Sequence, residues 1–260
     1  MSARAAAIEA LRMLVQKISG APWAGDVVRL ASMVAPARRQ PDPYLLKVFH
    51  FLSERVLSIR DSPEPFAAPE FRLFSEAFMY SGEFQEAVRR GLAAVKARPG
   101  SAAVDVHSCT GVCLELAAPQ WGKLVAVDPS RLNLELVEER LRGIGASNYE
   151  LLVGDVLSIA RLVRDPVGLA IAASPATWLI NPRVLVSRAF STLEPGGQLL
   201  LVAPLERGDS VNPLAPFIAA LKGPAPVSRE SLEDTMLTEG FARVRSWEGD
   251  LLTTIVAVKP

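Results

Sequence analysis

The C-terminal part of this chain repeats a short apolar segment followed by a polar turn, in an order that few folds allow. One apolar segment ends at Asp105, the next ends at Asp128, and a third is followed by Gly154 and Asp155. Residues 194–197 (EPGG) then precede a further apolar segment. Apolar runs of this length that alternate with amphipathic helical segments are typical of βαβ units. The sequence therefore predicts an α/β fold built on a parallel sheet.

The end of the chain distinguishes between families of such sheets. Residues 241–247 and 251–258 have strand character and are joined only by residues 248–250 (EGD). So short a connection permits only an antiparallel pair. A dinucleotide-binding dehydrogenase would continue with another helix and a parallel strand, so a nicotinamide-dependent reductase is disfavoured. We expect a Rossmann-like, seven-stranded sheet with an antiparallel final strand.

The other elements of this region follow from the same alternation. Strands one to five are expected at residues 102–106, 123–127, 149–153, 167–173 and 198–202. Helices are expected at residues 111–118, 129–142 and 228–239, with a further apolar stripe over residues 186–193. The apolar side of the second helix is expected to consist of Leu132, Leu136, Val137 and Leu141.

The N-terminal part of the chain has no convincing strand. Helix-like apolar spacing occurs over residues 5–18, 26–34, 44–59 and 71–96. Between the first three of these segments and before the fourth, prolines forbid a continuous helix. Residues 98–100 (RPG) mark a boundary. We therefore expect two parts: a helical cap or substrate-binding region over residues 1–98 and a Rossmann-like domain over residues 99–260.

Charge and composition limit the classes of partner. The formal net charge is zero, and the longest basic runs are two arginine pairs, so a nucleic-acid substrate is disfavoured. Charged residues interrupt the apolar stripe of residues 1–18, which therefore lacks the apolar run of a signal peptide or membrane span. We expect a cytoplasmic protein without a membrane segment. Arg exceeds Lys and Pro is frequent, which favours a thermophilic source.

The two cysteines are interpreted as structural. Cys109 and Cys113 lie four residues apart, at the expected start of one helix, a placement that suits buried thiols better than a disulfide. A metal site would need more ligands than two Cys and two His so placed. No metal is expected.

Five fragments, taken together and in order, carry a resemblance to a known family. Over residues 101–260 the sequence resembles the class I S-adenosylmethionine-dependent methyltransferases. The fragments are residues 103–105 with 110–111 (AVD and TG), 125–130 (VAVDPS), 154–155 (GD), 193–201 (LEPGGQLLL) and the ending EGF…VAVKP. The resemblance implies S-adenosylmethionine as cofactor and a small molecule as methyl acceptor.

The resemblance also assigns site residues. Those assigned to the cofactor are Asp105, His107, Cys109, Thr110, Gly111, Asp128, Pro129, Gly154, Asp155, Val156 and Ser174. Independently of the family, a carboxylate at the carboxyl end of the second strand can accept two hydrogen bonds from a ribose diol. The alternative for Asp128 is a cap of the helix expected to begin at Pro129. Asp155 would accept from the adenine amino group, or is a turn residue after Gly154.

The loop after the first strand departs from the family pattern. Family members follow the strand-one acid with three alternating glycines, which let the backbone approach the cofactor. Here His107 and Cys109 stand at the first two positions, and only Gly111 remains. Either the pocket is reshaped or the cofactor no longer binds. His107 is interpreted as a cofactor contact or a plug rather than a catalytic base.

Aromatic residues offer further candidates. Phe74, Phe78 and Tyr80 precede the sheet domain, where related enzymes fold an aromatic helix over the cofactor; the alternative is an aromatic core stripe. Trp178 follows the fourth strand, where relatives place substrate-facing residues, and could stack on a ligand.

Three functions stay open at this point. The leading one is methyl transfer from S-adenosylmethionine to a small molecule, which mainly requires alignment of donor and acceptor. No general base is identified. Another transferase that uses the same cofactor, similar to nicotianamine synthase, is an alternative because such enzymes also carry a helical N-terminal region. The third is a non-catalytic scaffold or binding protein, suggested by the missing glycines. The methyl acceptor and a homo-oligomeric state are left open.

Overall fold

The computed structural model of the chain describes residues 1–98, 100–208 and 210–260. Pro99, which belongs to the expected boundary between the two parts, lies outside the described residues.

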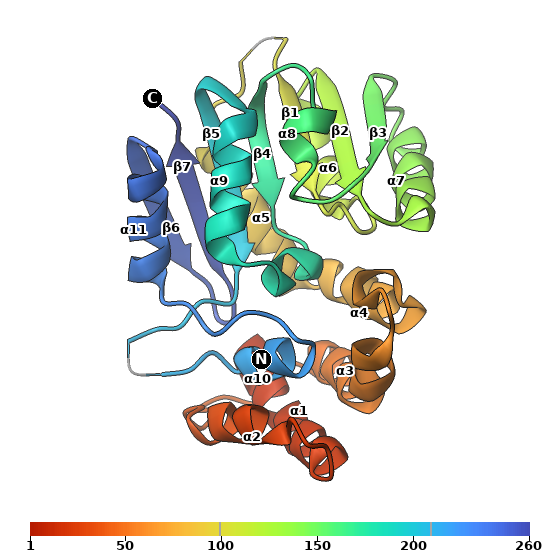
Figure 1. Cartoon of the computed structure of the whole chain (residues 1–260), viewed down its shortest axis with the longest axis vertical. Helices are drawn as coiled ribbons and strands as arrows, with labels where there is room; N and C mark the ends of the chain where they lie inside the picture. The colour runs from red at the N-terminus through yellow and green to blue at the C-terminus, as the bar shows by residue number, and fades with distance from the viewer. Residues whose placement is uncertain (99, 209) are drawn as a thin grey trace.

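The seven strands form one sheet in the order β3-β2-β1-β4-β5-β7-β6 (Figure 1). β1 to β5 run parallel, and β7 pairs antiparallel with both β5 and β6. This confirms the predicted sheet with an antiparallel final strand. The strands are β1 (Ala102–Val106), β2 (Lys123–Asp128), β3 (Tyr149–Val153), β4 (Val167–Ala172), β5 (Leu193–Ala203), β6 (Arg243–Glu248) and β7 (Thr253–Val258).

The last strand lies inside the sheet, and the strand before it lies at the edge. β7 is almost entirely buried, whereas β6 alternates between exposed and half-buried residues. Its sequence carries Arg243, Arg245 and Glu248. Charged residues on an edge strand discourage pairing with another chain, which explains why the more apolar β7 takes the inner position.

Helices cover both faces of the sheet. One face packs on α5, α6 and α7, and the other on α8, α9 and α11, so each face has its own hydrophobic cluster. These helices are α5 (Gly82–Ala94), α6 (Val112–Ala117), α7 (Arg131–Gly143), α8 (Ile159–Leu162), α9 (Pro182–Thr192) and α11 (Arg229–Glu239). Short 3-10 turns are η2 (Ala118–Gln120) and η3 (Pro175–Leu179).

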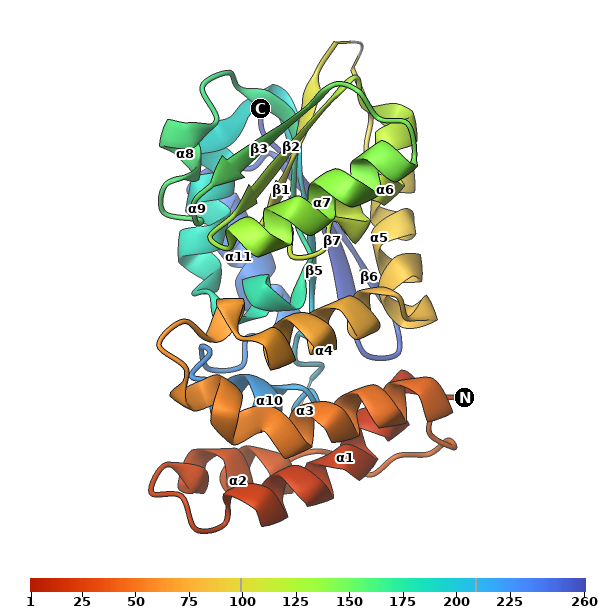
Figure 2. The same ribbon diagram turned by 90° about the vertical axis from the view of Figure 1, so that its right-hand side faces the viewer.

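The N-terminal helices lie at the edge where the parallel strands end (Figure 2). They are α1 (Ala3–Ile18), α2 (Ala24–Ser32), α3 (Pro43–Asp61), η1 (Pro65–Ala67) and α4 (Pro69–Met79). α10 (Ala215–Ala220), from the segment after β5, packs on α2 and α3. One hydrophobic cluster continues from α1 through α4 and α5 onto the sheet. The two expected parts therefore share a core.

Two helix predictions are wrong in detail. The single helix expected over residues 71–96 is two helices, because Ser81 caps α5 by accepting a hydrogen bond from Phe84 N. α7 begins at Arg131 rather than at Pro129, because Ser130 is its N-cap and has an extended backbone.

The buried side of α7 also differs from the prediction. It consists of Asn133, Leu134, Val137 and Leu141. Leu132, expected on that side, has 49% of its surface exposed. The buried side includes the polar Asn133 because its side-chain amide donates to the Asp128 carboxylate.

Among the described residues, no helix combines the length and the apolar character needed to cross a bilayer.

Candidate functional site

The residues that the resemblance assigns to a cofactor gather at the carboxyl ends of β1 to β4. Residues 107–111 follow β1, Asp128 ends β2, Gly154 and Asp155 follow β3, and Ser174 follows β4. Because β2, β1 and β4 are neighbours, these segments meet at one edge of the sheet. The Ser174 hydroxyl donates to the backbone oxygen of His107, which joins the β4 end to the loop after β1.

Internal partners occupy the Asp128 carboxylate. Oδ1 accepts from Ser130 N at 2.9 Å and from Asn133 Nδ2 at 3.0 Å, and Oδ2 accepts from Cys109 N at 2.9 Å. The residue has only 1% of its surface exposed. Burial raises the pKa of Asp128 to about 6, although these hydrogen bonds act in the opposite direction. The carboxylate therefore holds together β2, the start of α7 and the loop after β1, and Asn133 is buried because it serves this carboxylate.

The loop after β1 keeps a glycine-like backbone without the glycines. The φ angles are +53° at His107, +50° at Cys109 and +79° at Gly111. L-residues rarely adopt this left-handed conformation, and a residue held in it stores about 1–3 kcal/mol of strain. At Gly111 a Cβ would also lie 3.2 Å from Val137 Cα. The two side chains that replace glycines therefore stand on a backbone path suited to glycine.

His107 is buried against the N-terminal region. Its ring lies 5.5 Å from that of Phe66 in η1, measured between centroids, and 3% of its surface is exposed. Its Nδ1 has no hydrogen-bond partner among the described residues. Burial lowers the pKa of His107 to about 4, against the opposing charge of Asp155. The imidazole is therefore neutral at neutral pH.

The thiols and Asp105 are also enclosed. Cys109 and Cys113 are free and buried, and burial raises the pKa of both thiols, which makes them poor nucleophiles. Asp105 is fully buried, and neither of its carboxyl oxygens has a partner within the described residues. Burial, followed by the charge of Asp128, raises the pKa of Asp105. Its neutral form is favoured.

The segment after β3 forms a tight turn. Asp155 Oδ1 accepts from the amide and the hydroxyl of Ser158, at 2.9 and 2.8 Å. Partial burial raises the pKa of Asp155, but these hydrogen bonds outweigh it, and the net shift is downward. A Cβ on Gly154 would come within 2.2 Å of Leu162 Cδ1, so glycine allows α8 to approach. Val156 is buried in the core, whereas Pro129 is exposed.

Two residues that contact the loop after β1, Arg140 and Phe66, were not named in the sequence analysis. Arg140 on α7 donates from Nε to Thr110 O at 2.6 Å and from Nη1 to Glu115 Oε2 at 2.9 Å. It also donates to the hydroxyl of Tyr80, whose ring faces the guanidinium. The sequence held one signal for Arg140: it lies between Val137 and Leu141 of the apolar stripe, where a charged side chain needs a partner. Phe66 carried no signal in the sequence.

The aromatic candidates divide between core and surface. Phe74 and Phe78 are buried and stack at 5.9 Å between centroids, as members of the aromatic core stripe that was the stated alternative. Tyr80 is 47% exposed. Trp178 donates from Nε1 to Val202 O at 3.0 Å and lies edge-on to Phe78 at 5.2 Å. Its indole also lines a cavity described below.

Several solved structures are similar to this one. An O-methyltransferase family protein from Burkholderia thailandensis has a TM-score of 0.63 and 15% identity, over 88% of this chain and 76% of its own. The mitomycin 7-O-methyltransferase MmcR has a TM-score of 0.62 and 17% identity, over 85% and 74%. A candidate O-methyltransferase from Nostoc punctiforme has a TM-score of 0.63 and 18% identity, over 90% and 72%.

This chain has the class I methyltransferase fold. At these identities the likeness establishes the fold alone. No family model matches the sequence, and a search of curated proteins finds no match. Open α/β sheets bind ligands at the carboxyl ends of their parallel strands, here β1 to β4. In this chain the loop after β1, Phe66 and Arg140 cover that position.

Proposed function

We propose that this chain is an S-adenosylmethionine-dependent methyltransferase that acts on a small molecule. The observation that carries the proposal is the position of Asp128, a carboxylate at the carboxyl end of β2, hydrogen-bonded at 2.9 Å to a loop with a left-handed backbone. Carboxylate oxygens at this edge suit the hydroxyls of a ribose. The similar folds named above support the same class of reaction.

The residues present fit one half of the cofactor. Asp128 and Asp155 supply acceptors suited to the ribose hydroxyls and the adenine amino group. The other half fits poorly, because His107 and Cys109 occupy the positions where glycines would leave room for the methionine moiety. Both are at least 96% buried. Binding therefore requires the loop to move away from its cover.

The cofactor, when bound, supplies a methyl group on a sulfonium. The chain itself would align the acceptor and exclude water, since alignment is what such a transfer mainly demands. Burial lowers the pKa of His107 to about 4, so its imidazole accepts a proton only weakly, and its ring faces Phe66; both argue for a role as a plug or contact rather than as a base.

A second candidate is favoured by a specific observation. The three internal hydrogen bonds to Asp128, together with its 1% exposure, are what a carboxylate of purely structural use would show. In that case the chain is a non-catalytic scaffold that retains the methyltransferase fold.

Calorimetric titration with S-adenosylhomocysteine separates the two candidates. We expect measurable binding by the wild type, and at least about tenfold weaker binding by Asp128→Ala because charge-assisted hydrogen bonds are lost. Asp165→Ala, which changes an exposed aspartate, is the matched control. A folded Asp128→Ala variant that binds as the wild type does would show that the carboxylate has no part in binding.

A double change of His107 and Cys109 to glycine tests the loop. If the side chains only reshape a working site, affinity changes modestly. If they block it, the wild type shows no binding and the double-glycine variant gains it. Failure of both proteins to bind, with the fold intact by circular dichroism, would refute the methyltransferase proposal and leave the scaffold.

A further inference from the structure

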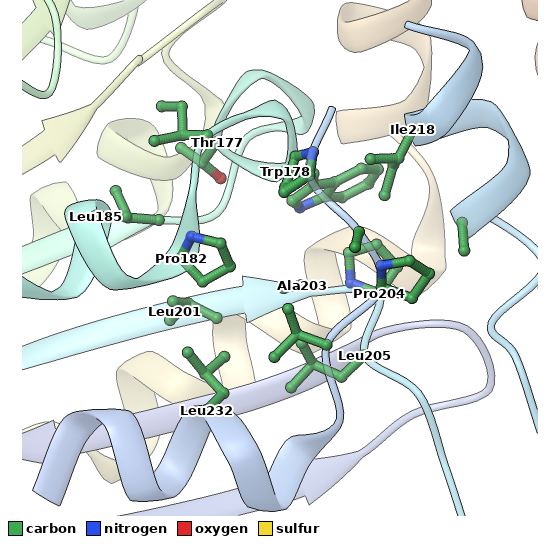
Figure 3. Close-up of a pocket in the computed structure, with 16 residues that line it drawn as sticks. Thr177, Trp178, Pro182, Leu185, Leu201, Ala203, Pro204, Leu205, Ile218 and Leu232 are labelled. Atoms are coloured by element: carbon green, nitrogen blue, oxygen red, sulfur yellow. The ribbon is translucent and has the colours of Figure 1, made fainter. Parts of the chain in front are cut away.

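An apolar cavity lies on the other side of the loop that follows β4. Figure 3 shows side chains from η3, α9, the end of β5 and the start of α11 converging on one space. Trp178 and Ile218 form one wall, and Leu185, Leu201 and Leu232 line the opposite side. None of the residues that the resemblance assigns to the cofactor lines it. It is therefore a space separate from the edge closed by His107.

The two polar side chains that line this cavity already have hydrogen-bond partners. The Trp178 Nε1 donates to Val202 O at 3.0 Å, and the Thr177 hydroxyl donates to Ser174 O at 2.7 Å. No lining residue carries a charge. Among the described residues no charged side chain faces a ligand here, so a charged or strongly polar group inside would lose hydration without a side chain of opposite charge to offset it, which is unfavourable. The chemistry of the wall thus selects an uncharged apolar group.

The cavity has a buried floor and an open rim. Leu185, Leu201 and Leu232 are at most 3% exposed. The rim contains four prolines that are partly exposed, Pro182, Pro204, Pro224 and Pro226. Proline fixes φ, so this rim loses little conformational freedom when a ligand enters. The entrance is therefore largely preformed.

The size of the space limits the ligand. About 550 Å³ is free of protein atoms, part of it open solvent, but the centre of a water-sized group can move in only ≈ 50 Å³. One such group needs about 10–15 Å³ on this measure, so the enclosed part takes about four groups of water or methylene size. A fused ring system has more atoms than this, so only a short alkyl segment of a ligand fits in the enclosed part.

We propose that this cavity binds the unbranched, uncharged alkyl chain of a small molecule. The chain enters between the prolines and ends against Leu185 and Leu201, with any polar head group left in solvent at the rim. This site does not depend on S-adenosylmethionine, so it applies equally to an enzyme and to a scaffold. In either case it makes an aliphatic compound a ligand of this chain.

Saturation-transfer NMR with 1-hexanol on the full chain, without S-adenosylmethionine, tests the proposal. Hexane-1,6-diol is the matched probe, because one of its hydroxyls would have to enter the apolar floor formed by the leucines. We expect 1-hexanol to bind at least about tenfold more tightly than the diol. Equal signals from the two would overturn the proposal, as would preferential binding of the planar 2-naphthol.

Two variants locate the binding. Ala203→Phe places a ring in the cavity and is expected to abolish the 1-hexanol signal, whereas Ala242→Phe, at an exposed alanine outside it, is expected to leave the signal unchanged. Leu185→Ala deepens the floor and is expected to shift the preference from 1-hexanol toward 1-decanol, which a folding defect would not do. An unchanged signal in Ala203→Phe, or no change of chain-length preference in Leu185→Ala, would place the alcohol elsewhere and refute the site.

Discussion

The Nε of Arg140 donates a hydrogen bond to the backbone oxygen of Thr110 at 2.6 Å, and so ties α7 to the loop after β1. The same guanidinium contacts Glu115 on α6 and Tyr80 after α4. Only 14% of the Arg140 side chain is exposed. One residue therefore connects the N-terminal helices, the loop and two helices of the sheet domain.

Replacing Arg140 should destabilise the fold and loosen the loop. For Arg140→Met we expect the free energy of unfolding to fall by about 2 kcal/mol, since partly buried charge-assisted hydrogen bonds are lost. Urea denaturation measures this. The control is Arg142→Met on the same helix, whose side chain is 69% exposed and whose ion pair with Glu138 should contribute less than about 0.5 kcal/mol. Equal losses in the two variants would contradict the role given to Arg140.

Gly111 should tolerate no side chain. Its φ of +79° disfavours alanine, and a Cβ would lie 3.2 Å from the backbone of α7 at Val137. We expect Gly111→Ala to lower the free energy of unfolding by about 1–3 kcal/mol. Gly143→Ala is the control, because nothing lies within 4 Å of a Cβ there; it should be neutral or slightly stabilising. Thermal unfolding of the two variants distinguishes them, and similar melting temperatures would argue against the loop geometry.

His107 should make stability rise with pH. Its folded-state pKa of about 4 lies below the ordinary value of 6.5, so the unfolded chain binds more protons between these pH values. The contribution of His107 is complete above pH 6.5 and falls as the pH drops toward 4, by about 3 kcal/mol in total. In urea titrations, the free energy of unfolding of the wild type minus that of His107→Gln should rise by about 3 kcal/mol between pH 4 and 6.5. A constant difference would mean that the imidazole is solvated.

Asp128 should make the free energy of unfolding fall as the pH rises from about 4 to 6. Its pKa is about 6 in the folded state and near 3.8 ordinarily, so the folded chain binds more protons between these values. Stability from this group is therefore lost as the pH rises from 4 to 6. Relative to Asp128→Asn, the wild type should lose about 3 kcal/mol over that interval. A slope of the same sign as for His107 would show that burial does not control this carboxyl group.

The fold was largely predictable because its signals are local. Strand β1 and strand β3 have the predicted bounds, since apolar runs bordered by turn residues need no distant information. The connection before β7 was expected to be three residues and is four, residues 249–252, but either length allows only an antiparallel pair, which the sheet confirms. The start of α7 was not predicted correctly, because Pro129 suits a first helical turn, whereas the hydrogen bonds of Ser130 to Asp128 Oδ1 and from Asn133 N make Ser130 the N-cap and Arg131 the first helical residue.

The site was predictable only in part. That Asp128 and the loop at His107 lie at one edge follows from strand order. Two features could not be predicted, because they depend on packing between different segments of the chain. Asn133 donates to one oxygen of the Asp128 carboxylate, and Phe66 covers the imidazole of His107.

The sequence by itself thus determined the sheet, the antiparallel ending and the residues available at the carboxyl edge, because strand periodicity and short connections act over a few residues. Only the tertiary structure decided whether that edge is open. Burial, which shifts the pKa values of Asp128 and His107 and encloses the alkyl-sized cavity beside Trp178, arises when distant segments exclude water together, and no local pattern encodes it.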